Sequence, residues 1–591
     1  MPVALNRLAA ALRVLSFGIG VAQAQTSRVR RGSPLLQPLP VPATVIRLSS
    51  LSSQTLPLRR QPARRRAALA LVSQSLLSGL LLISGCRAET LPLPAAPEAP
   101  ETSVPAQPVS ALHWPVARPA PLNTAEPVLL VALAARLGFA ADGREAAADP
   151  LVLRASSGLL TLVDSDGQRF QSPRLSLHWR LEPLASPLQI RRRVLSPFAS
   201  HESAEEAARA WRAQGVETTI ARPREWEVWA PPEAADPPGR SATLVERQEN
   251  GRLVLELRRA EGTVTLRGPI RILAPEGLVW GEGIYGGPFL LQPDAYGSWS
   301  LVEQVPLERY LEGVVPHEIG AGSPAAALEA QAILARTWAL RNRLRFQVDG
   351  YHLCADTQCQ VYSDPRAAGT SVRNAIAASR EQLLAADGQP IHAVYHASNG
   401  GMAAGFDEVW QGAPLPYLRA FADGPAGFVS RYPLPLKPAA LSALLKAGAP
   451  LPWGADHSLF RWQRTLTAAQ LSSALGNGAR NLGTPTRLRV LSRGPSGRVL
   501  ALEIGGTGGT RVLRLDAIRR TLRQLPSTLF EVTPAGPGRW LVRGGGFGHG
   551  AGLSQAGAID LARRGWSSER ILQHYYRGTE LVPLRSLGEA L

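Results

Sequence analysis

The stretch VPLERYLEGVVPHEIGAGSPAAALEAQAILARTWALRN, residues 305–342, decides the fold because the hydrophobic periodicity of the chain changes within it. Short apolar runs separated by glycine and proline precede it, a pattern typical of strands. Inside it, Leu328, Ala332, Ala335 and Ala339 recur at helical spacing and predict a helix with an apolar stripe. The order of strand blocks around a helical block predicts an α+β fold, in which a helical region is inserted in a mixed, strand-rich domain.

The start of that helix places one acidic residue in a connection. Ser323 is suited to be the N-cap and Pro324 the first helical residue. Glu318 then lies in a loop that begins at Pro316. A carboxylate on a short, stiff connection between packed elements is where catalytic groups are often placed. A solvated surface acid is the alternative that the residues alone leave open.

The rest of the chain divides by composition. An N-terminal leader is followed by a Pro/Ala-rich tether, then by a β-rich region that contains a strand–helix–strand unit, and then by the domain with the helical block. The predicted boundaries are 1–86 for the leader, 87–125 for the tether, 126–250 for the β-rich region and 251–585 for the domain. The unit at 196–231 faintly resembles the SPOR-type peptidoglycan-binding repeat, and an αβ insertion without a binding role is equally compatible with its pattern.

Later segments complete the predicted fold. We expect an insert with a proline-rich loop and helical patches, two further strand regions and a final helix. These are predicted at 425–480, at 487–516 and 529–543, and at 553–563.

The net charge of +18 at first suggests a nucleic-acid partner. Residues 1–66, however, contain eleven arginines and no acidic residue, and subtracting them leaves +7 for the other 525 residues. That remainder shows no arginine stripe interleaved with aromatic residues. We therefore do not expect nucleic acid as a partner, whereas an anionic polymer or a membrane surface is compatible with the charge.

The leader has the features of an export signal. From Arg64 it reads RRRAALALVSQSLLSGLLLISGC, a basic cluster followed by an apolar run and small residues. Its end, Ile83 to Cys86, resembles the cleavage box of bacterial lipoproteins, which implies acylation of Cys86. A plain signal, a transmembrane anchor or a buried helix is the alternative, since about seventeen apolar residues nearly span a bilayer. Residues 1–25 form a second, weaker signal, so we expect translation to start shortly before Arg64. An exported, membrane-anchored protein of the cell envelope or periplasm is predicted.

Several ordered phrases carry a resemblance to a known family. They are LERYL (307–311), VPHE (315–318), AQA…ART (330–337), HASNGG (396–401), GFGHGAGLSQ (546–555) and ILQHYY (571–576). In this order they resemble the SpoIID/LytB family of sporulation cell-wall lytic proteins and amidase enhancers, over about 250–582.

The resemblance implies a role for Glu318. In that family the equivalent glutamate is the residue on which glycan cleavage depends. A protonated Glu318 would donate to the oxygen between N-acetylmuramic acid and N-acetylglucosamine, and its carboxylate would then take the proton of the muramic C6 hydroxyl. The product is a 1,6-anhydro end, formed without a cofactor or a metal. A hydrolase would need a second carboxyl group, for which Glu312, Glu329, Asp407 and Glu408 are available.

Other residues are weaker candidates for substrate binding. They are His396, Ser398, His549, Ser554, Gln555, Tyr362 and Trp410. The histidine at 549 either binds sugar or orients the glutamate, or it is structural in a tight turn. The aromatic residues, Tyr395 included, either stack on sugar rings or fill the core. The His–Ser pair at 396 and 398 also has the residue types of a nucleophile, but one strand face explains it equally well.

Two cysteines follow the helical block. Cys354 and Cys359 lie in HLCADTQCQVY, and in an oxidising, exported setting a disulfide is the simplest expectation. Free thiols and a metal site are the alternatives. Some relatives place a histidine before the second cysteine, where this chain has Gln358, so a zinc site with His352 is short of ligands.

Two functions therefore compete. One is a lytic transglycosylase that acts on peptidoglycan glycan strands. The other is a non-catalytic peptidoglycan-binding protein that stimulates a cell-wall amidase. In both, the chain is held at the membrane by its lipid anchor, and a structural envelope lipoprotein is a third reading.

Overall fold

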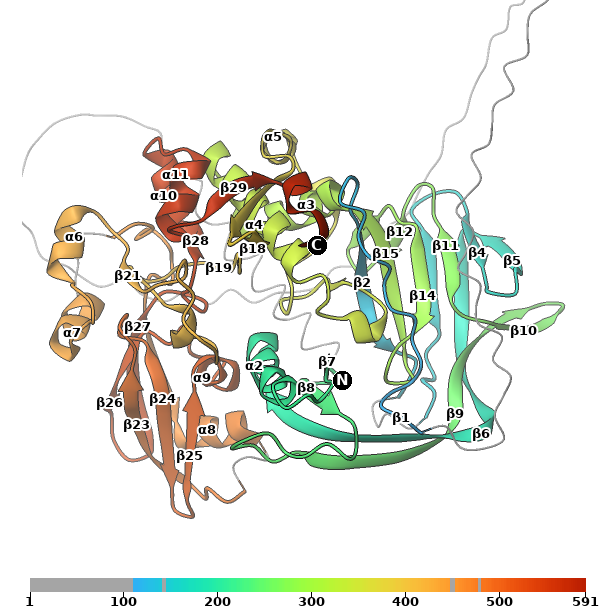
Figure 1. The fold of residues 1–591 in the computed structure, drawn as a ribbon, viewed down its shortest axis with the longest axis horizontal. Coiled ribbons are helices and arrows are strands. Elements are labelled where there is room, and N and C mark those ends of the chain that lie inside the picture. The colour runs from blue at the N-terminus through green and yellow to red at the C-terminus, as the bar shows by residue number, and fades with distance from the viewer. Residues whose placement is uncertain (1–109, 141–144, 447–451, 477–479, 591) are drawn as a thin grey trace, which may run out of the picture. The chain divides into compact units, whose positions relative to one another are not determined.

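The computed structural model describes residues 110–140, 145–446, 452–476 and 480–590 (Figure 1). Contacts divide the chain between Ala99 and Pro100, so every described element belongs to the second unit. The predicted leader at 1–86 with Cys86, and the first part of the predicted tether, lie outside the described residues. Within the described ranges, no helix combines the length and the apolar character needed to cross a bilayer.

The end of the predicted tether is part of the fold. Strand β1 (Ser110–Ala111) pairs in parallel with β6 (Arg174–Phe198). Beyond it, Trp114 packs so closely on Gly297 that a Cβ at that glycine would lie 2.6 Å from the indole nitrogen. The last part of the predicted Pro/Ala-rich tether therefore contacts the sheet region through β1 and Trp114.

Two sheets form the N-terminal half of the described chain. One has the order β10-β9-β6-β3-β12-β13, and the other β16-β2-β15-β14-β11-β4-β5. Alternate residues of both sheets, such as Leu153, Leu255 and Ile272, are buried in one shared core. The remaining strands of these sheets are β2 (Val128–Leu137), β3 (Leu151–Ala155), β4 (Leu160–Val163), β5 (Arg169–Ser172), β9 (Thr243–Arg259), β10 (Gly262–Leu266), β11 (Ile270–Leu273), β12 (Leu278–Trp280), β13 (Gly283–Tyr285), β14 (Phe289–Pro293), β15 (Trp299–Pro306) and β16 (Leu353–Cys354).

The predicted boundary between residues 250 and 251 falls inside strand β9. This strand pairs antiparallel with β6 from Leu177↔Leu257 to Val194↔Thr243. Asn250-Gly251 reads as a turn, but here the register shift in β6 between Pro183 and Leu188 lets the long strand continue past it. The regions on either side of residue 250 therefore share one sheet.

The strand–helix–strand unit is attached to the end of β6. It consists of α2 (His201–Arg212), β7 (Thr219–Ala221) and β8 (Trp226–Ala230), and β8 pairs with both β7 and β6 (Figure 1). Ser200 caps the helix by accepting a hydrogen bond from the backbone N–H of Ser203. The helix lies within the predicted strand–helix–strand unit at 196–231.

The helical block lies directly after β15. It contains α3 (Leu307–Val315), the π-helical segment η1 (Pro316–Gly320), α4 (Ala325–Arg341) and α5 (Thr370–Ala378). The block packs against a small sheet of β18 (Gln389–Pro390), β17 (Gln382–Ala386) and β29 (Glu580–Pro583). It also packs against two later helices, α10 (Gln555–Arg563) and α11 (Ser568–Tyr575). The buried Arg336 on α4 makes two 2.8 Å hydrogen bonds to Glu308 on α3. This ion pair fixes the two helices to each other.

Helix α4 is buried on every side beyond its first turn, and not only along the predicted stripe. Residues 330–340 are all buried. Its N-cap is Pro324, and the Ser323 hydroxyl instead donates to the Ile319 carbonyl. The prediction of Ser323 as the cap is wrong, because its side chain closes the preceding turn.

The C-terminal half adds small sheets and short helices with cores of their own. The predicted strand and helix regions of this half are present, and the fold is α+β. The elements are β19 (Tyr395–His396), β20 (Met402–Ala403), β21 (Phe421–Ala422), α6 (Ala426–Arg431), α7 (Pro438–Lys446), β22 (Arg461–Thr467), α8 (Ala468–Leu475), β23 (Pro485–Arg493), β24 (Val499–Gly506), β25 (Thr510–Arg514), α9 (Asp516–Thr521), β26 (Phe530–Pro534), β27 (Arg539–Gly545) and β28 (Leu553–Ser554).

Candidate functional site

Glu318 lies in η1, the π-helical segment between α3 and α4, and it is half-buried. The sequence predicts a loop on a short, stiff connection here, but the chain keeps a helical path from Pro316 to Gly320. That glycine has a φ of 88°, a left-handed conformation that ends the segment. Short π-helical turns are frequent at functional sites. The backbone beneath Glu318 is thus held by its own helical turn.

The carboxyl group of Glu318 is oriented from a second segment. The backbone N–H of Val361 donates to its Oε1 over 2.7 Å. Next to this bond, the N–H of Ser363 donates to the carbonyl of Gly313 on α3. A Cβ at that glycine would lie 2.3 Å from Cε2 of Tyr362. The segment around residue 361 therefore touches the helix closely enough that only glycine fits.

Side chains on either side of Val361 fix the same segment. The Tyr310 hydroxyl donates to Oε1 of Gln360, whose amide N–H donates to the carbonyl of Ala335 on α4. The Tyr362 ring stacks on Tyr310 with centroids 5.0 Å apart, and its hydroxyl donates to a buried glutamate. Tyr362 is only 3% exposed. It is a core aromatic residue in this structure and does not present a face for a sugar ring.

A disulfide lies just before this segment. Cys354 and Cys359 are joined, with their Cα atoms 5.7 Å apart. The ring of His352 is used elsewhere, because its Nδ1 accepts a hydrogen bond from the N–H of Leu130. Within the described ranges, no group of three or more His, Cys, Asp or Glu side chains is arranged to hold a metal ion. The disulfide closes the turn that leads into Val361.

Tyr395 connects Glu318 with the histidine turn. Burial, and after it the charge of Glu318, raises the pKa of Tyr395 well above its usual value. Its hydroxyl is buried without a well-formed hydrogen bond among the described residues and faces Gln360. Its carbonyl accepts a 2.7 Å hydrogen bond from Nε2 of His549, since Nδ1 of that ring accepts from the N–H of Ala551. Tyr395 thus lies near enough to Glu318 to respond to its charge and is hydrogen-bonded to the histidine turn.

The two histidine phrases are paired in space. Strands β19 and β28 run in parallel with His396 opposite Ser554, and Ser398 bridges to Phe547. The rings of His396 and His549 lie 5.2 Å apart, edge to face. Burial lowers the pKa of His549 to about 4 and that of His396 well below its usual value. Both rings are therefore neutral near pH 7.

Several predicted binding residues have structural roles here. Ser554 is the N-cap of α10 and accepts from the N–H of Gly557. Ser398 is 2% exposed, and the N–H of Gly400 donates to its hydroxyl. Trp410 is 5% exposed and packs 5.1 Å from the ring of His549. We find no exposed sugar-binding face on these side chains, because the paired phrases bury them.

Gln555 leads to a residue that the sequence analysis missed. Its amide N–H donates to Oε1 of Gln331, a fully buried residue of α4. Tyr310 lies in the phrase LERYL and Gln331 in AQA…ART, so the family-like phrases did contain both residues. Val361 acts through its backbone N–H, and no side-chain pattern indicates such a role.

The other candidate carboxylates have partners of their own. Glu312 pairs with Arg309, and Glu329 accepts from the Ser568 hydroxyl. Glu408 is buried and accepts from the N–H and the hydroxyl of Ser496. None of these contacts involves Glu318, and Asp407 is exposed.

Comparison with known proteins finds a family model that matches most of the helical block. The model for a stage II sporulation protein matches residues 295–385, and a domain of unknown function, DUF8618, matches residues 404–552. The chain is 28% identical over 298 residues to stage II sporulation protein D of Bacillus subtilis, covering 47% of this chain and 75% of that protein. It is 26% identical over 290 residues to an uncharacterised protein of Brachyspira hyodysenteriae, covering 48% of this chain and 68% of that protein.

A further relative carries a different name. The amidase enhancer of Bacillus subtilis is 26% identical over 302 residues, which cover 46% of this chain and 40% of that protein. Residues 295–385, which match the family model, include the segment with Glu318 and α4. This part of the chain is therefore similar to the SpoIID/LytB family, whose named relatives here are stage II sporulation protein D and an amidase enhancer.

Proposed function

We propose that this protein is a peptidoglycan lytic transglycosylase that cleaves the bond between N-acetylmuramic acid and N-acetylglucosamine. The observation that carries the proposal is the fixed carboxyl group of Glu318. Its backbone is part of a π-helical turn, and its Oε1 accepts a hydrogen bond from the N–H of Val361. Similarity to the SpoIID/LytB family supports a cell-wall role.

The proposed reaction uses one carboxyl group twice. Glu318 first gives its proton to the glycosidic oxygen while positive charge develops at C1 of the muramic ring. The carboxylate so formed then removes the proton of the C6 hydroxyl, and O6 closes on C1. The glycosidic bond is broken, an anhydro bond is formed and the glutamate regains its proton. No water and no second carboxylate are consumed.

The surroundings of Glu318 support this role. Buried tyrosines lie beside it, and Tyr395 stays protonated at neutral pH because its pKa is well above the usual value. A neutral hydroxyl donor in a poorly solvated site interacts strongly with charge that develops there. His549, neutral above about pH 4, fixes the position of Tyr395 through its carbonyl.

A second function, a non-catalytic enhancer of a cell-wall amidase, is favoured by a different observation. Ser398, Ser554 and Trp410 are all buried, which leaves few of the predicted binding groups to hold a substrate. One relative is named amidase enhancer. In this case Glu318 is a structural residue and the partner is an amidase.

One experiment separates the two functions. The purified chain is incubated with glycan strands stripped of stem peptides, and products are analysed by mass spectrometry for 1,6-anhydro ends. The transglycosylase proposal predicts anhydro products from the chain alone. The enhancer proposal predicts none, but faster release of stem peptides when a cell-wall amidase is added.

We place the protein outside the cytoplasm as part of the same proposal. A disulfide at Cys354 and Cys359 is expected of an oxidising compartment. Anchoring through acylated Cys86 would be tested by fractionating cells that carry Cys86→Ser. The anchor predicts that the variant leaves the membrane fraction, and an unchanged distribution contradicts it.

A further inference from the structure

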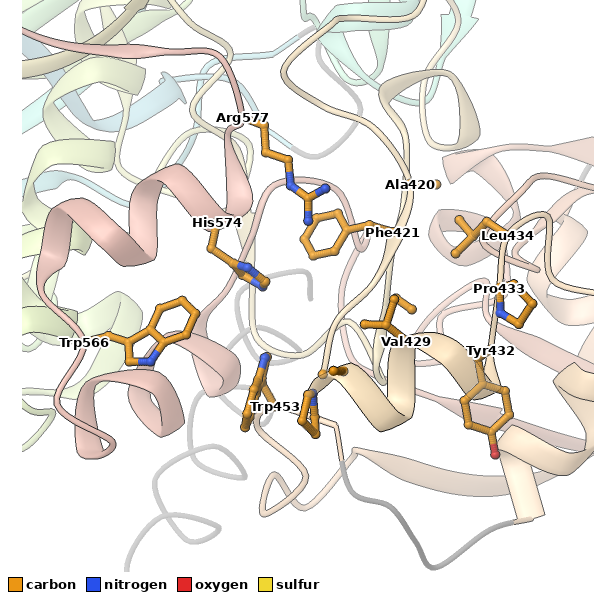
Figure 2. A pocket seen from close by; sticks show the side chains of 14 residues that line it. Ala420, Phe421, Val429, Tyr432, Pro433, Leu434, Trp453, Trp566, His574 and Arg577 are labelled. Atoms are coloured by element: carbon orange, nitrogen blue, oxygen red, sulfur yellow. The ribbon is translucent and has the colours of Figure 1, made fainter.

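A cavity of about 540 Å³ lies in the C-terminal half, between two segments far apart in sequence. Phe421 of β21 and Val429 of α6 come from one segment, and Trp566, His574 of α11 and Arg577 from the other, with Trp453 between them (Figure 2). This volume is in the usual range of about 300–1,000 Å³ for small-molecule sites. Its lining shares no residue with the neighbourhood of Glu318.

The walls of the cavity are aromatic rings set at right angles. The ring of His574 lies between those of Phe421 and Trp566, 5.2 Å and 5.7 Å away, edge to face with both (Figure 2). Phe421, Trp453 and Trp566 are all partly exposed. Large aromatic surface left open in a hollow marks a binding site more often than a core.

Arginines stack on these rings. The guanidinium carbon of Arg577 lies 4.8 Å from the centroid of Phe421, and that of Arg570 lies 3.8 Å from Trp566. Arg564 is placed in the same way over Trp453, at 4.7 Å. Among the described residues that line the cavity there is no carboxylate. The site therefore favours a ligand that carries negative charge.

A buried carboxylate holds the inner wall in place. Nε2 of His574 donates to Oδ1 of the fully buried Asp423 over 2.8 Å. The other oxygen of Asp423 accepts from Asn399 and from the hydroxyl of Tyr575, at 2.6 and 3.0 Å. Its carbonyl accepts from the backbone N–H of Trp453. Two walls of the cavity are thus fixed to one residue.

A second cavity, of about 970 Å³, adjoins the first. Both are lined by Phe421 and Arg577. The second adds Arg419 but also the carboxylates of Asp387 and Glu580, so the preference for negative charge applies to the first cavity. The Phe421–Arg577 pair is therefore shared between two neighbouring hollows. Adjoining hollows with a cation between them suit a linear polymer with repeating rings better than a single small molecule.

We propose that these cavities form a second glycan site, which binds an N-acetylated amino sugar bearing a carboxylate. The apolar C–H face of such a sugar packs on the indole rings, its N-acetyl methyl fits beside Val429, and its carboxylate pairs with Arg577. The proposal rests on the proposed function only for the choice of polymer, since the site would hold a strand while Glu318 acts elsewhere on it.

The test measures binding without cleavage. Full-length chain with Glu318→Gln is titrated calorimetrically with the N-acetylglucosamine–N-acetylmuramic acid disaccharide that has a free lactyl carboxylate, with chitobiose, and with a free stem peptide. We expect the acidic disaccharide to bind about tenfold more tightly than chitobiose. Trp566→Ala should weaken both sugars about tenfold, with partial rescue by Trp566→Phe, and Arg577→Gln should remove the difference between the two sugars.

The controls separate this site from the catalytic proposal. Trp280→Ala, at a half-buried tryptophan of β12, should leave binding unchanged, and unfolding curves of all variants should match. If Trp566→Ala and Arg577→Gln both leave the sugar affinity unchanged, the glycan site is overturned. If only the stem peptide binds, the cavities are a peptide site. If wild-type protein makes no anhydro products while binding still depends on Trp566, the proposed function fails and the glycan site stands.

Discussion

The backbone N–H of Val361 donates a 2.7 Å hydrogen bond to Oε1 of Glu318, although the two residues are 43 positions apart. The bond places the carboxyl group of η1 under the control of a separate segment, which the disulfide at Cys354 and Cys359 and the stacked Tyr362 hold against α3. Any change that moves this segment should move the proposed catalytic group.

Gly313 is where α3 and the segment around Val361 approach each other so closely that a side chain has no room. Because a Cβ there would lie 2.6 Å from the carbonyl oxygen of Ser363, Gly313→Ala must push the segment away from α3. We expect the free energy of unfolding to fall by about 1–3 kcal/mol, measured by urea denaturation, and cleavage to fall with it. Gly322→Ala is the control, since no atom lies within 4 Å of its Cβ position. Equal stability of the two variants would contradict the contact.

The ion pair between Glu308 and Arg336 should stabilise the two helices. Arg336 is fully buried, so Glu308→Gln leaves a buried guanidinium without its counter-charge. We expect a loss of about 2–4 kcal/mol in unfolding free energy. Glu312→Gln breaks a more exposed pair on the same helix and should cost at most about 1 kcal/mol. A Glu308 variant no less stable than the Glu312 variant would show that the buried pair does not hold the helices.

The disulfide should contribute through the short loop that it closes. Replacing Cys354 and Cys359 together by serine should lower the unfolding free energy by about 2 kcal/mol. Dithiothreitol should bring the wild-type protein to the same value and leave the double variant unchanged. If the reductant has no effect on the wild type at full reduction, the disulfide does not support the segment.

Histidine burial predicts a loss of stability in acid. Burial, with the charge of Arg519, lowers the pKa of His549 from 6.5 to about 4. Between these values the unfolded chain binds the proton more readily, so this contribution is complete above pH 6.5 and is lost as the pH falls towards 4. His549→Gln should reduce the loss between pH 7.5 and 4.5 by about 2 kcal/mol, read from urea midpoints. A variant with the same acid sensitivity as wild type would contradict the burial of this ring.

Local patterns were enough to predict most elements. The helix α10, the strands after residue 485 and the helix that starts after Pro324 all follow from hydrophobic periodicity. The predicted cap at Ser323 was wrong, and α11 follows the helix that was expected to be the last. Long-range pairing was not predictable in the same way. Asn250-Gly251 has the sequence of a turn, yet its pairing with β6 keeps it in a strand, because the partner strand supplies the irregularity.

The candidate site shows the same division. Glu318, His396 and His549 were found from their phrases, and the pairing of β19 with β28 brings the two histidines together. The burial of Trp410 and Tyr362 was not predictable, because an aromatic residue in a motif has the same sequence whether it meets sugar or packs in a core. The N–H of Val361 is a backbone group, so its hydrogen bond to Glu318 could not be predicted from side-chain types.

The rate of anhydro-end formation from denuded glycan strands, compared between wild type and Glu318→Gln, tests the central claim most directly. Glutamine keeps the oxygen that accepts from Val361 but has no proton to exchange, so the fold should be unchanged while product falls at least about 100-fold. Matching unfolding curves would serve as the control for the fold. A variant that forms 1,6-anhydro products at the wild-type rate would contradict the account.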